Sequence, residues 1–448
     1  MSVDWLLERM ATFGDRPALI GRDRDHTYKQ LVDSVLRWQQ QLTDLAIAPG
    51  EVVAIGGDYS PDVCSLLVAL LTWKAIVVPL GMAAETTAGR QLDVAHVGHV
   101  FSFDEASWTY RRRTRPAGAH PLLTRLRQAG DAGLVVFTSG STGESKGAVL
   151  SVGALLSKFH TLRRGYRTLV FLQLDHIGGI NTLLHILTQG GAAATIDERS
   201  PEAVCAAVEA HRIELLPTTP TFLNMLLISE AYTHHDLSSL KLITYGTEPM
   251  PASTLAQLRQ VLPAVKLKQT YGLTEIGILP TQSRDSSSLW MRLGGDGLEY
   301  KIVDDILWLR CNSAMLGYLN APTPFDSEGW FNTEDMVETN GEYIRVLGRR
   351  GEVINVGGAK VYPTKVESVL LEMSNVEDVT VHGRRNPVTG AIVVAKVSLR
   401  EPEDLATFRR RMRHHCREAL EPHEIPALVE FTDQPHYGQR FKKARSIT

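Results

Sequence analysis

A short loop at residues 138–147 constrains the fold and function of this chain more than any other segment. It is rich in glycine, serine and threonine, and apolar runs lie directly before it (134–137) and after it (148–150). These runs predict two buried strands joined by a loop of small residues. Glycine and hydroxyl residues allow backbone N–H groups to surround an anion, and the lysine adds a positive charge. We therefore predict a phosphate-binding loop formed by Thr138, Ser139, Gly140, Ser141, Thr142, Gly143 and Lys146.

Two other functions are compatible with a loop of this composition. The Walker A loop of P-loop ATPases and kinases requires a glycine before the lysine, serine or threonine after it, and a helix next. Here Ser145 precedes Lys146, Gly147 follows it, and the next residues have an extended pattern. These differences disfavour a P-loop. The second alternative is a flexible Gly/Ser linker, which the composition of the loop does not exclude by itself.

Other motifs in the chain decide between these interpretations through a family resemblance. The loop resembles the phosphate loop of the AMP-forming adenylating enzymes, which include acyl-CoA synthetases, peptide-synthetase adenylation domains and luciferases. Matching segments follow in the family's order at residues 271–275 (Y-G-x-T-E), 317–318 (G-Y), 330–335 (W-[FY]-x-T-G-D, with Glu334 in place of glycine), 348–355 and 357–363. They span nearly the whole chain, which is most similar to the free-standing acyl-CoA synthetases. The resemblance implies an α/β fold: a large layered N-terminal domain of sheets and helices, and a small, mobile α+β C-terminal domain.

The composition agrees with a soluble, cytoplasmic enzyme. The 448 residues, 44% of them hydrophobic, suffice for a large core and two or three domains. The net charge of −3 does not indicate a nucleic-acid partner or an anionic membrane. The four cysteines show no metal-ligand spacing and are typical of buried thiols in a reducing compartment. The first residues lack the features of a signal peptide. Lys74 and Pro79 interrupt the most apolar stretch, at residues 66–82, so we predict a helix and then a strand there rather than a membrane span.

Alternating helical and extended patterns over residues 1–345 predict a layered α/β domain. Residues 28–45 carry apolar side chains at helical spacing, residues 52–55 read as a strand, 62–72 as a helix and 76–78 as a strand. From residue 310 the pattern changes to short extended segments. We place the domain boundaries at residues 1–348 for the nucleotide-binding and acyl-binding domain, 349–352 for a hinge and 353–448 for the mobile domain.

The smaller C-terminal unit has predicted strands near residues 376–381 and 391–399 and a helix at 403–420. This helix carries a cluster of arginines at positions 409, 410, 411 and 413. We interpret them as a solvated face, with Leu405, Phe408 and Met412 turned inward. A nucleic-acid or CoA-phosphate site is the alternative that we disfavour.

The chemistry that the resemblance implies needs charge compensation, because the carboxylate of an acid must approach the anionic α-phosphate of ATP. The resemblance assigns the Thr274 hydroxyl to the α-phosphate and Glu275 to Mg²⁺. In isolation these residues also fit a helix cap and a surface charge. Tyr271 presents a flat face for adenine, although a core aromatic is its alternative, and Asp335, assisted by Arg349, is expected at the ribose hydroxyls. The remaining residues that the resemblance places along the nucleotide are Gly246, Thr247, Glu248 and Gly272.

The adenylation lysine is expected near the C-terminus, where the family carries a G-K-x-x-R-like signature. Lys442 has the required spacing to Arg445, with Phe441 in place of the usual glycine. Lys443 is the alternative candidate, and the simplest alternative is that these residues form a basic tail without a catalytic lysine. We favour Lys442 by its spacing.

In this superfamily the C-terminal domain rotates between two half-reactions and exchanges the lysine loop for a glycine loop. The resemblance therefore implies that Gly357 and Gly358 approach the thiol of CoA and its pantetheine arm, and that Lys360 contacts phosphate. Gly351 stands where relatives carry the hinge residue, and glycine can absorb a large change in backbone angles.

The acyl pocket is expected around residues 175–181, with His176 as its gate near the incoming carboxylate. A satisfied structural histidine is the alternative. Ile177 occupies the position where amino-acid-activating relatives hold the substrate amine with aspartate, so an uncharged fatty or aryl acid is favoured. Three functions remain open: an acid–CoA ligase, a ligase that loads the phosphopantetheine of a separate acyl carrier protein, and a non-catalytic nucleotide-binding relative. The exact acid, the pathway and the oligomeric state cannot be read from the sequence.

Overall fold

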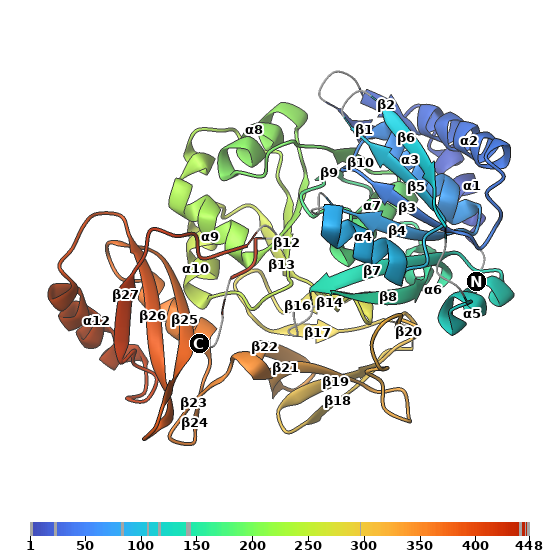
Figure 1. Ribbon diagram of the computed structural model, residues 1–448. Coiled ribbons are helices and arrows are strands. Elements are labelled where there is room, and N and C mark those ends of the chain that lie inside the picture. The colour runs from blue at the N-terminus through green and yellow to red at the C-terminus, as the bar shows by residue number, and fades with distance from the viewer. Residues whose placement is uncertain are drawn as a thin grey trace.

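The computed structural model describes residues 3–21, 25–81, 85–104, 107–114, 118–139, 145–295, 297–438, 441–443 and 445. They form a large N-terminal domain and a smaller C-terminal domain, which is drawn in orange and red beside α9 and α10 in Figure 1. Strands and helices alternate through the larger domain, as the sequence predicts for an α/β fold.

Two seven-stranded sheets, as formed by the described residues, are the main layers of the larger domain. The first has the order β13 (Lys266–Gln269), β12 (Leu242–Tyr245), β11 (Leu215–Thr218), β9 (Arg167–Leu169), β10 (Ala192–Ala194), β1 (Pro17–Ile20) and β2 (Asp25–Thr27). The second has the order β20 (Gly317–Tyr318), β8 (Ser145–Ser151), β7 (Gly133–Ser139), β4 (Ile76–Leu80), β3 (Val52–Gly56), β5 (His99–Phe103) and β6 (Trp108–Arg112).

Alternating apolar residues bury both faces of the second sheet. Val53 and Ile55 of β3 belong to the core between the two sheets, whereas Val52 and Ala54 belong to the core on the opposite face. Strands covered on both sides are apolar throughout, which explains why residues 52–55 read as an uninterrupted hydrophobic run. Helices fill the layers between and outside the sheets: α1 (Trp5–Thr12), α2 (Tyr28–Asp44), α3 (Pro61–Thr72), α4 (Glu85–Val94), α5 (Pro121–Ala129), α6 (Val152–Leu156), η1 (Ser157–Phe159), α7 (Ile177–Gln189), α8 (Pro201–His211), α9 (Pro220–Ser229), η2 (Ala231–Thr233) and α10 (Ala252–Val261).

The last part of the N-terminal domain, at residues 271–349, forms a third sheet and a hairpin. The six-stranded sheet has the order β16 (Thr281–Ser283), β17 (Met291–Leu293), β22 (Tyr343–Arg349), β21 (Phe331–Asn340), β19 (Ile306–Arg310) and β18 (Glu299–Val303). The hairpin pairs β14 (Tyr271–Leu273) with β15 (Gly277–Leu279). Strands β21 and β22 are longer than the short segments that the sequence pattern predicts.

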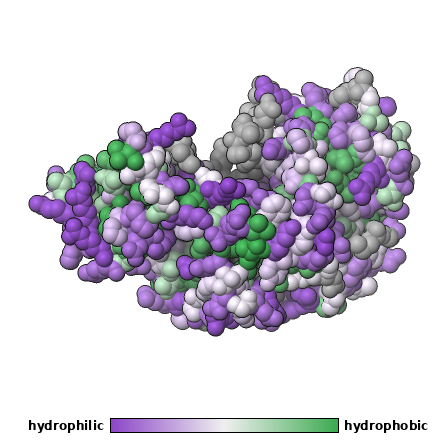
Figure 2. Space-filling model, turned by 90° about the horizontal axis from the view of Figure 1, so that it is seen from below, coloured by the Kyte–Doolittle hydropathy of each residue, from purple (hydrophilic) through white to green (hydrophobic). Residues whose placement is uncertain are grey.

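The C-terminal domain has its own apolar core beneath a five-stranded sheet. Its elements are η3 (Arg350–Glu352), β23 (Ile354–Val356), β24 (Ala359–Val361), α11 (Pro363–Leu371), β25 (Val376–Asn386), β26 (Gly390–Leu399), α12 (Leu405–Ala419) and β27 (Leu428–Phe431). Phe408 and Met412 of α12 are buried as predicted. Leu405 is 39% exposed, because it begins the helix at its solvent end, and the prediction that it turns inward is wrong. The α12 end of the molecule is mostly hydrophilic in Figure 2, in agreement with a solvated arginine face.

The local predictions agree with these elements. The helix predicted at 28–45 is α2, whose Leu31, Val35, Trp38 and Leu42 are all buried and which begins with a capping box at Thr27. The apolar stretch at 66–82 falls on helix α3 and strand β4. In the part of the chain that the structure describes, no helix has both the length and the hydrophobicity of a membrane span.

Candidate active site

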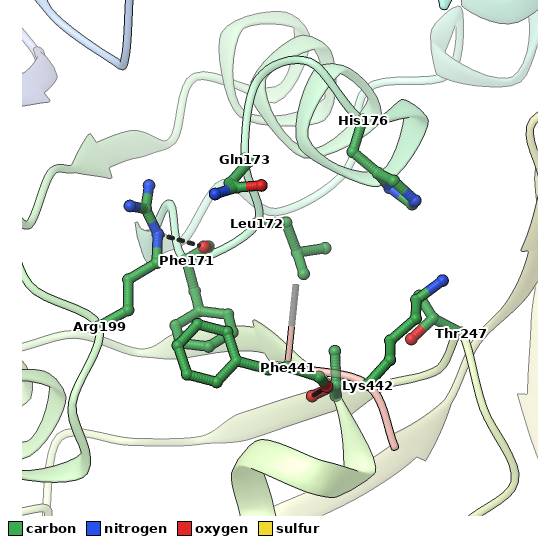
Figure 3. A pocket seen from close by; sticks show the side chains of 9 residues that line it. Phe171, Leu172, Gln173, His176, Arg199, Thr247, Phe441 and Lys442 are labelled. Carbon is green, nitrogen blue, oxygen red and sulfur yellow. Dashed lines mark hydrogen bonds between the residues drawn. The ribbon is translucent and has the colours of Figure 1, made fainter. Parts of the chain in front are cut away.

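A pocket lies where the C-terminal segment meets the N-terminal domain (Figure 3). It encloses about 380 Å³ of empty space, part of which is open to solvent. We call this cavity the active-site pocket. Its lining residues are Phe171, Leu172, Gln173, His176, Arg199, Thr219, Thr247, Phe441 and Lys442. The last two come from the C-terminal segment, so the complete pocket exists only when that segment is docked on the N-terminal domain.

His176 reaches the pocket from the first turn of α7. It is the N-cap residue of this helix, and its Nδ1 accepts a hydrogen bond of 3.2 Å from the backbone N–H of Gly178. Because Nδ1 accepts, the proton of the neutral ring lies on Nε2, which is then a hydrogen-bond donor. A Cβ atom at Gly179 would lie 2.0 Å from the carbonyl oxygen of Gln173, so glycine is required where the chain folds back over the pocket. The predicted gate residue is therefore at the pocket, although its role stays a prediction.

The two candidate lysines lie in different surroundings. Lys442 lines the pocket, and its side chain extends toward Thr247 on the side where His176 lies (Figure 3). The side chain of Lys443 is 6% exposed. Its Nζ forms an ion pair with Asp378 and donates a hydrogen bond of 2.9 Å to the backbone oxygen of Val379. This geometry favours Lys442 as the lysine that acts in the pocket.

Arg445 joins the lysine segment, by which we mean residues 441–443 and 445 around Lys442, to the predicted hinge at residues 349–352. Its guanidinium forms ion pairs with Glu367 at 2.6 Å and with Glu352 at 3.1 Å. Glu352 closes the short helix η3 directly after β22. The arginine of the K-x-x-R spacing is thus buried at the base of the segment, where it supports the position of Lys442.

The predicted phosphate loop joins two antiparallel strands, as its flanking apolar runs indicate. Thr138 of β7 pairs with Lys146 of β8, and Ser139 pairs with Ser145. The predicted binding residues Gly140, Ser141, Thr142 and Gly143 lie outside the described residues. The amine of Lys146 lies over the ring of Tyr318, 5.5 Å from its centroid.

Tyr318 links this loop to Glu275. The Tyr318 hydroxyl donates a hydrogen bond to Oε1 of Glu275, and burial together with the Glu275 charge raises the pKa of Tyr318 well above its ordinary value. Thr274 and Glu275 lie in the turn of the β14–β15 hairpin, and Thr274 is 7% exposed. Thr274 is therefore not a helix cap. Tyr318 thus contacts both Lys146 and Glu275, and the role of these two residues in binding phosphate and Mg²⁺ stays a prediction.

Asp335, Arg349 and Tyr271 form a second polar cluster beside this hairpin. Asp335 on β21 pairs in register with Arg349 on β22, and Oδ1 lies 3.3 Å from Nε of the arginine. The Tyr271 hydroxyl donates to Oδ2 of Asp335 at 2.5 Å. Burial raises the pKa of Asp335, and the Arg349 charge and the Tyr271 hydrogen bond oppose that shift. Glu334 has a φ of 59° at the position where the family carries glycine, so the chain keeps the left-handed conformation without the residue that favours it.

The segment at 246–248 and Gly272 have clear structural constraints. A Cβ atom at Gly246 would lie 2.5 Å from Oγ1 of Thr270, and one at Gly272 would lie 2.6 Å from the backbone oxygen of Gly277. Thr247 lines the pocket with a φ of 75°. Oε2 of Glu248 accepts a hydrogen bond of 3.1 Å from the backbone N–H of Lys443, so this carboxylate connects the N-terminal domain to the lysine segment.

The glycine loop does not line the pocket in this arrangement. Gly357 and Gly358, with φ of 60° and 92°, form the tight turn of the β23–β24 hairpin. Lys360 pairs with Asp305 at 3.0 Å. The structure thus brings the lysine segment to the pocket and leaves Gly357, Gly358 and Lys360 elsewhere.

Comparison with known proteins places this geometry in a family. The sequence profile described as "AMP-binding enzyme" matches residues 6–319, which is more than half of the chain. The chain belongs to the AMP-binding enzyme family. The profile of the AMP-binding enzyme C-terminal domain matches residues 365–439, so the predicted resemblance is confirmed for both domains.

The relatives of this AMP-binding enzyme are named as acid–CoA ligases. Indoleacetate–CoA ligase of Aromatoleum aromaticum is 28% identical, covering 88% of this chain and 87% of the relative. 2-Succinylbenzoate–CoA ligase of Bacillus pumilus is 26% identical, covering 96% and 94%. Among solved structures, the anthranilate CoA ligase AuaEII in complex with anthranoyl-AMP has a TM-score of 0.83 at 19% identity, covering 98% of this chain and 95% of that one. At that identity the likeness confirms the predicted fold alone.

Sequence reasoning missed several pocket residues of this AMP-binding enzyme. Arg199 hydrogen-bonds through Nε to the backbone oxygen of Phe171 at 2.8 Å and pairs with Asp58 at 2.8 Å. It lies in a loop after β10 with no motif around it, so no local signal announces it. Phe441 had a signal, because an aromatic residue stands where the family carries glycine.

The lysine amine behind the β14–β15 hairpin predicts that the stability of the AMP-binding enzyme depends on pH. Nζ of Lys158 donates to Oδ1 of Asn181 at 2.5 Å and to the backbone oxygen of Ile278 at 2.6 Å. Burial lowers the pKa of Lys158 from its ordinary 10.5 to about 7. Between these values the unfolded chain binds the proton that the folded chain has lost. The free energy of unfolding therefore rises with pH across this window.

We expect urea denaturation to show that Lys158 contributes about 1–2 kcal/mol to the increase in unfolding free energy between pH 7.5 and pH 9.5, allowing for the intermediate burial of this residue. Lys158→Met should remove this contribution. Lys29→Met, at an exposed lysine of α2, should leave the pH dependence as it is. An unchanged slope in Lys158→Met would contradict the prediction.

Proposed function

We propose that this protein activates a carboxylic acid as an acyl-adenylate, with release of pyrophosphate from ATP, and then transfers the acyl group to the thiol of CoA. The observation that carries this proposal is the position of Lys442 in one pocket with His176 and Thr247. The relatives named as CoA ligases support the same reaction. The proposed catalytic residues are Lys442, Thr274, Glu275 and His176.

Lys442 acts in the first half-reaction. The attacking carboxylate and the α-phosphate repel one another, and an ammonium group beside both reduces this repulsion most when charge is shared in the transition state. His176 Nε2 donates a hydrogen bond to the same carboxylate and so orients it. The Thr274 hydroxyl and Lys146 hold phosphate oxygens.

Glu275 fits a role as ligand to Mg²⁺. A carboxylate oxygen is a hard ligand, and Tyr318 fixes the orientation of this side chain through Oε1. Among the described residues no group of three or more histidine, cysteine, aspartate or glutamate side chains is placed to hold a metal. Mg²⁺ usually takes one or two carboxylates and completes its shell with phosphate and water, so a single carboxylate such as Glu275 suffices for it. When bound, the ion would neutralise charge on the phosphates.

Asp335 holds the ribose of ATP. Its carboxylate accepts hydrogen bonds from two adjacent hydroxyls, while Arg349 and Tyr271 keep it in place. Tyr271 is 7% exposed and lies in an apolar core. We therefore give it two roles: its hydroxyl positions Asp335, and its ring meets the adenine. Gly246, Thr247, Glu248 and Gly272 frame the remaining nucleotide surface.

The second half-reaction uses a different arrangement of the domains. We propose that rotation at residues 349–352 withdraws Lys442 and brings Gly357, Gly358 and Lys360 to the pocket. Such a rotation must break the ion pair between Lys360 and Asp305, which is exposed and therefore costs little to break. It must also break the hydrogen bonds that join Asn224 to Asp378 and Ser253 to Ser368 across the two bodies. The domains 1–348 and 353–448 would move as bodies around this hinge.

The acid is proposed to carry an uncharged acyl or aryl group. Phe171 and Leu172 line the pocket, and Ile177 begins the helix that carries His176. The relative named for indoleacetate favours an aromatic acid within this class, and 2-succinylbenzoate is also aromatic but keeps a second carboxylate after activation. A carrier-protein phosphopantetheine is the alternative acceptor. The amide bond synthetase McbA from Marinactinospora thermotolerans, 25% identical with a TM-score of 0.79 and covering 96% of this chain and 95% of that one, makes an amine a further acceptor to test.

Pyrophosphate release from ATP tests the proposal directly. We expect release that depends on an acid from a panel of aromatic, short, medium and long acids, and at least a tenfold increase when CoA is added, with thioester as the product. Acid-dependent release that CoA does not accelerate would indicate a carrier protein or an amine as acceptor. ATP binding without release for any acid would contradict the proposal and favour a non-catalytic relative.

A further inference from the structure

The segment that carries Lys442 is held on the N-terminal domain by the ring of Phe441. This ring lies 5.2 Å from the ring of Phe171 and 5.9 Å from that of Phe222, at its edge (Figure 3 shows the first pair). Phe171 and Phe222 are buried and belong to the apolar core against α8, α9 and α10. The backbone oxygen of Phe441 accepts a hydrogen bond of 2.7 Å from the Thr219 hydroxyl at the start of α9. A residue from the end of the chain thus completes a core of the N-terminal domain.

The backbone of Phe441 is strained for this contact. Its φ is 50°, a left-handed conformation that residues with bulky side chains rarely adopt. The backbone N–H of Phe441 donates to the oxygen of Gly438 at 3.0 Å, and that of Gly438 donates to the oxygen of Lys442 at 3.1 Å. A glycine would make this tight turn without strain. An aromatic residue in such a conformation persists because surrounding contacts compensate for it, and here those contacts come from the other domain.

Three consecutive residues therefore have three different attachments. Phe441 is anchored in the N-terminal domain, Lys443 is paired with Asp378 of the C-terminal domain, and Lys442 between them lines the pocket. Fixing both neighbours limits where the backbone of Lys442 can lie. A fixed backbone does not restrict the side-chain rotamers, but it confines the ammonium group to the region that a lysine can reach from one Cα position.

We propose that Phe441 is a positioning residue for the adenylation half-reaction, acting as an aromatic anchor that docks the Lys442 turn on Phe171 and Phe222. This inference rests on the proposed function of the pocket. The docked ring has a second effect. Any movement that withdraws Lys442 from the pocket must also separate the Phe441 ring from Phe171 and Phe222. Phe441 therefore favours the arrangement in which the acid is adenylated over the arrangement in which the acyl group is transferred.

The two half-reactions separate this role from a merely structural one. Phe441→Gly keeps the left-handed turn but removes the ring. We expect acid-dependent exchange of pyrophosphate into ATP to fall by about 10- to 100-fold. Transfer to CoA from a supplied acyl-adenylate should stay within about twofold of the unmodified protein, or rise. Phe441→Tyr, which keeps the ring, should retain the pyrophosphate exchange of the unmodified protein. Phe431→Leu, at an aromatic residue of β27 that is 39% exposed, is the control and should change neither rate.

An equal fall in both half-reactions, or no fall in exchange, would overturn the inference. Hydrogen–deuterium exchange of a peptide spanning residues 437–443 gives a readout that does not depend on activity. Phe441→Gly should exchange faster there, and an unchanged rate would show that the ring does not dock the turn. If the unmodified protein adenylates none of the acids, the proposed function fails, and this exchange measurement alone decides whether Phe441 is an anchor.

Discussion

Replacing Lys442 with alanine is expected to reduce acyl-adenylate formation by about 100- to 1,000-fold, the usual effect of removing a single charged group that stabilises a transition state. The reason is geometric. Lys442 lines the pocket with His176 and Thr247, and the neighbouring Lys443 cannot substitute because its amine is held by Asp378. Pyrophosphate exchange into ATP measures this step. Transfer to CoA from a supplied acyl-adenylate should remain, because the lysine is proposed to leave the pocket before that step.

Two further lysine variants make this result specific. Lys241→Ala removes an exposed lysine that pairs with Glu214 away from the pocket, and both half-reactions should be unaffected. Lys443→Ala leaves the buried Asp378 carboxylate without its cation and should destabilise the fold by roughly 3–5 kcal/mol. Its effect should appear as a lower melting temperature and a similar loss in both half-reactions. If Lys442→Ala also lost both half-reactions equally, Lys442 would not be the adenylation lysine.

The second large effect is expected at Asp335. Asp335→Asn keeps an oxygen that can accept from Tyr271, but it loses the negative charge beside Arg349 and one of the acceptors for the ribose. We expect the KM for ATP to rise by about 10- to 100-fold, equivalent to roughly 1.4–2.8 kcal/mol. The KM for the acid should change little, because Asp335 is not among the residues that line the active-site pocket.

A matched carboxylate in the same sheet provides the control. Glu299 on β18 pairs with Arg310 on β19 at 2.6 Å, and both side chains are largely exposed. Glu299→Gln therefore removes a more exposed cross-strand ion pair of the same sheet without touching the pocket, and the KM for ATP should stay within about twofold. A similar change in both variants would indicate a general effect on the sheet. An unchanged KM in Asp335→Asn would remove Asp335 from the nucleotide site.

Much of the local structure is predictable because it depends on neighbours in the chain. The apolar runs around the phosphate loop are β7 and β8, and the helical spacing of Leu31, Val35 and Trp38 is the buried face of α2. Periodicity of this kind reports which side of an element meets the core, and it survives whatever the element packs against. The family motifs add the candidate residues around ATP. Leu405 shows the limit, because a helical pattern does not reveal how far the covering layer extends.

The sequence by itself determined the fold class, the family and the candidate residues for nucleotide binding. Only the tertiary structure decided how those residues are held. Lys442 and Lys443 are adjacent and chemically identical, and contacts with Asp378 and with the pocket distinguish them. Phe441 meets Thr219, which lies 222 positions earlier in the chain, and no local pattern can encode that contact. The physical reason is that side-chain periodicity records burial within one element, whereas a site between domains depends on surfaces that only the folded chain brings together.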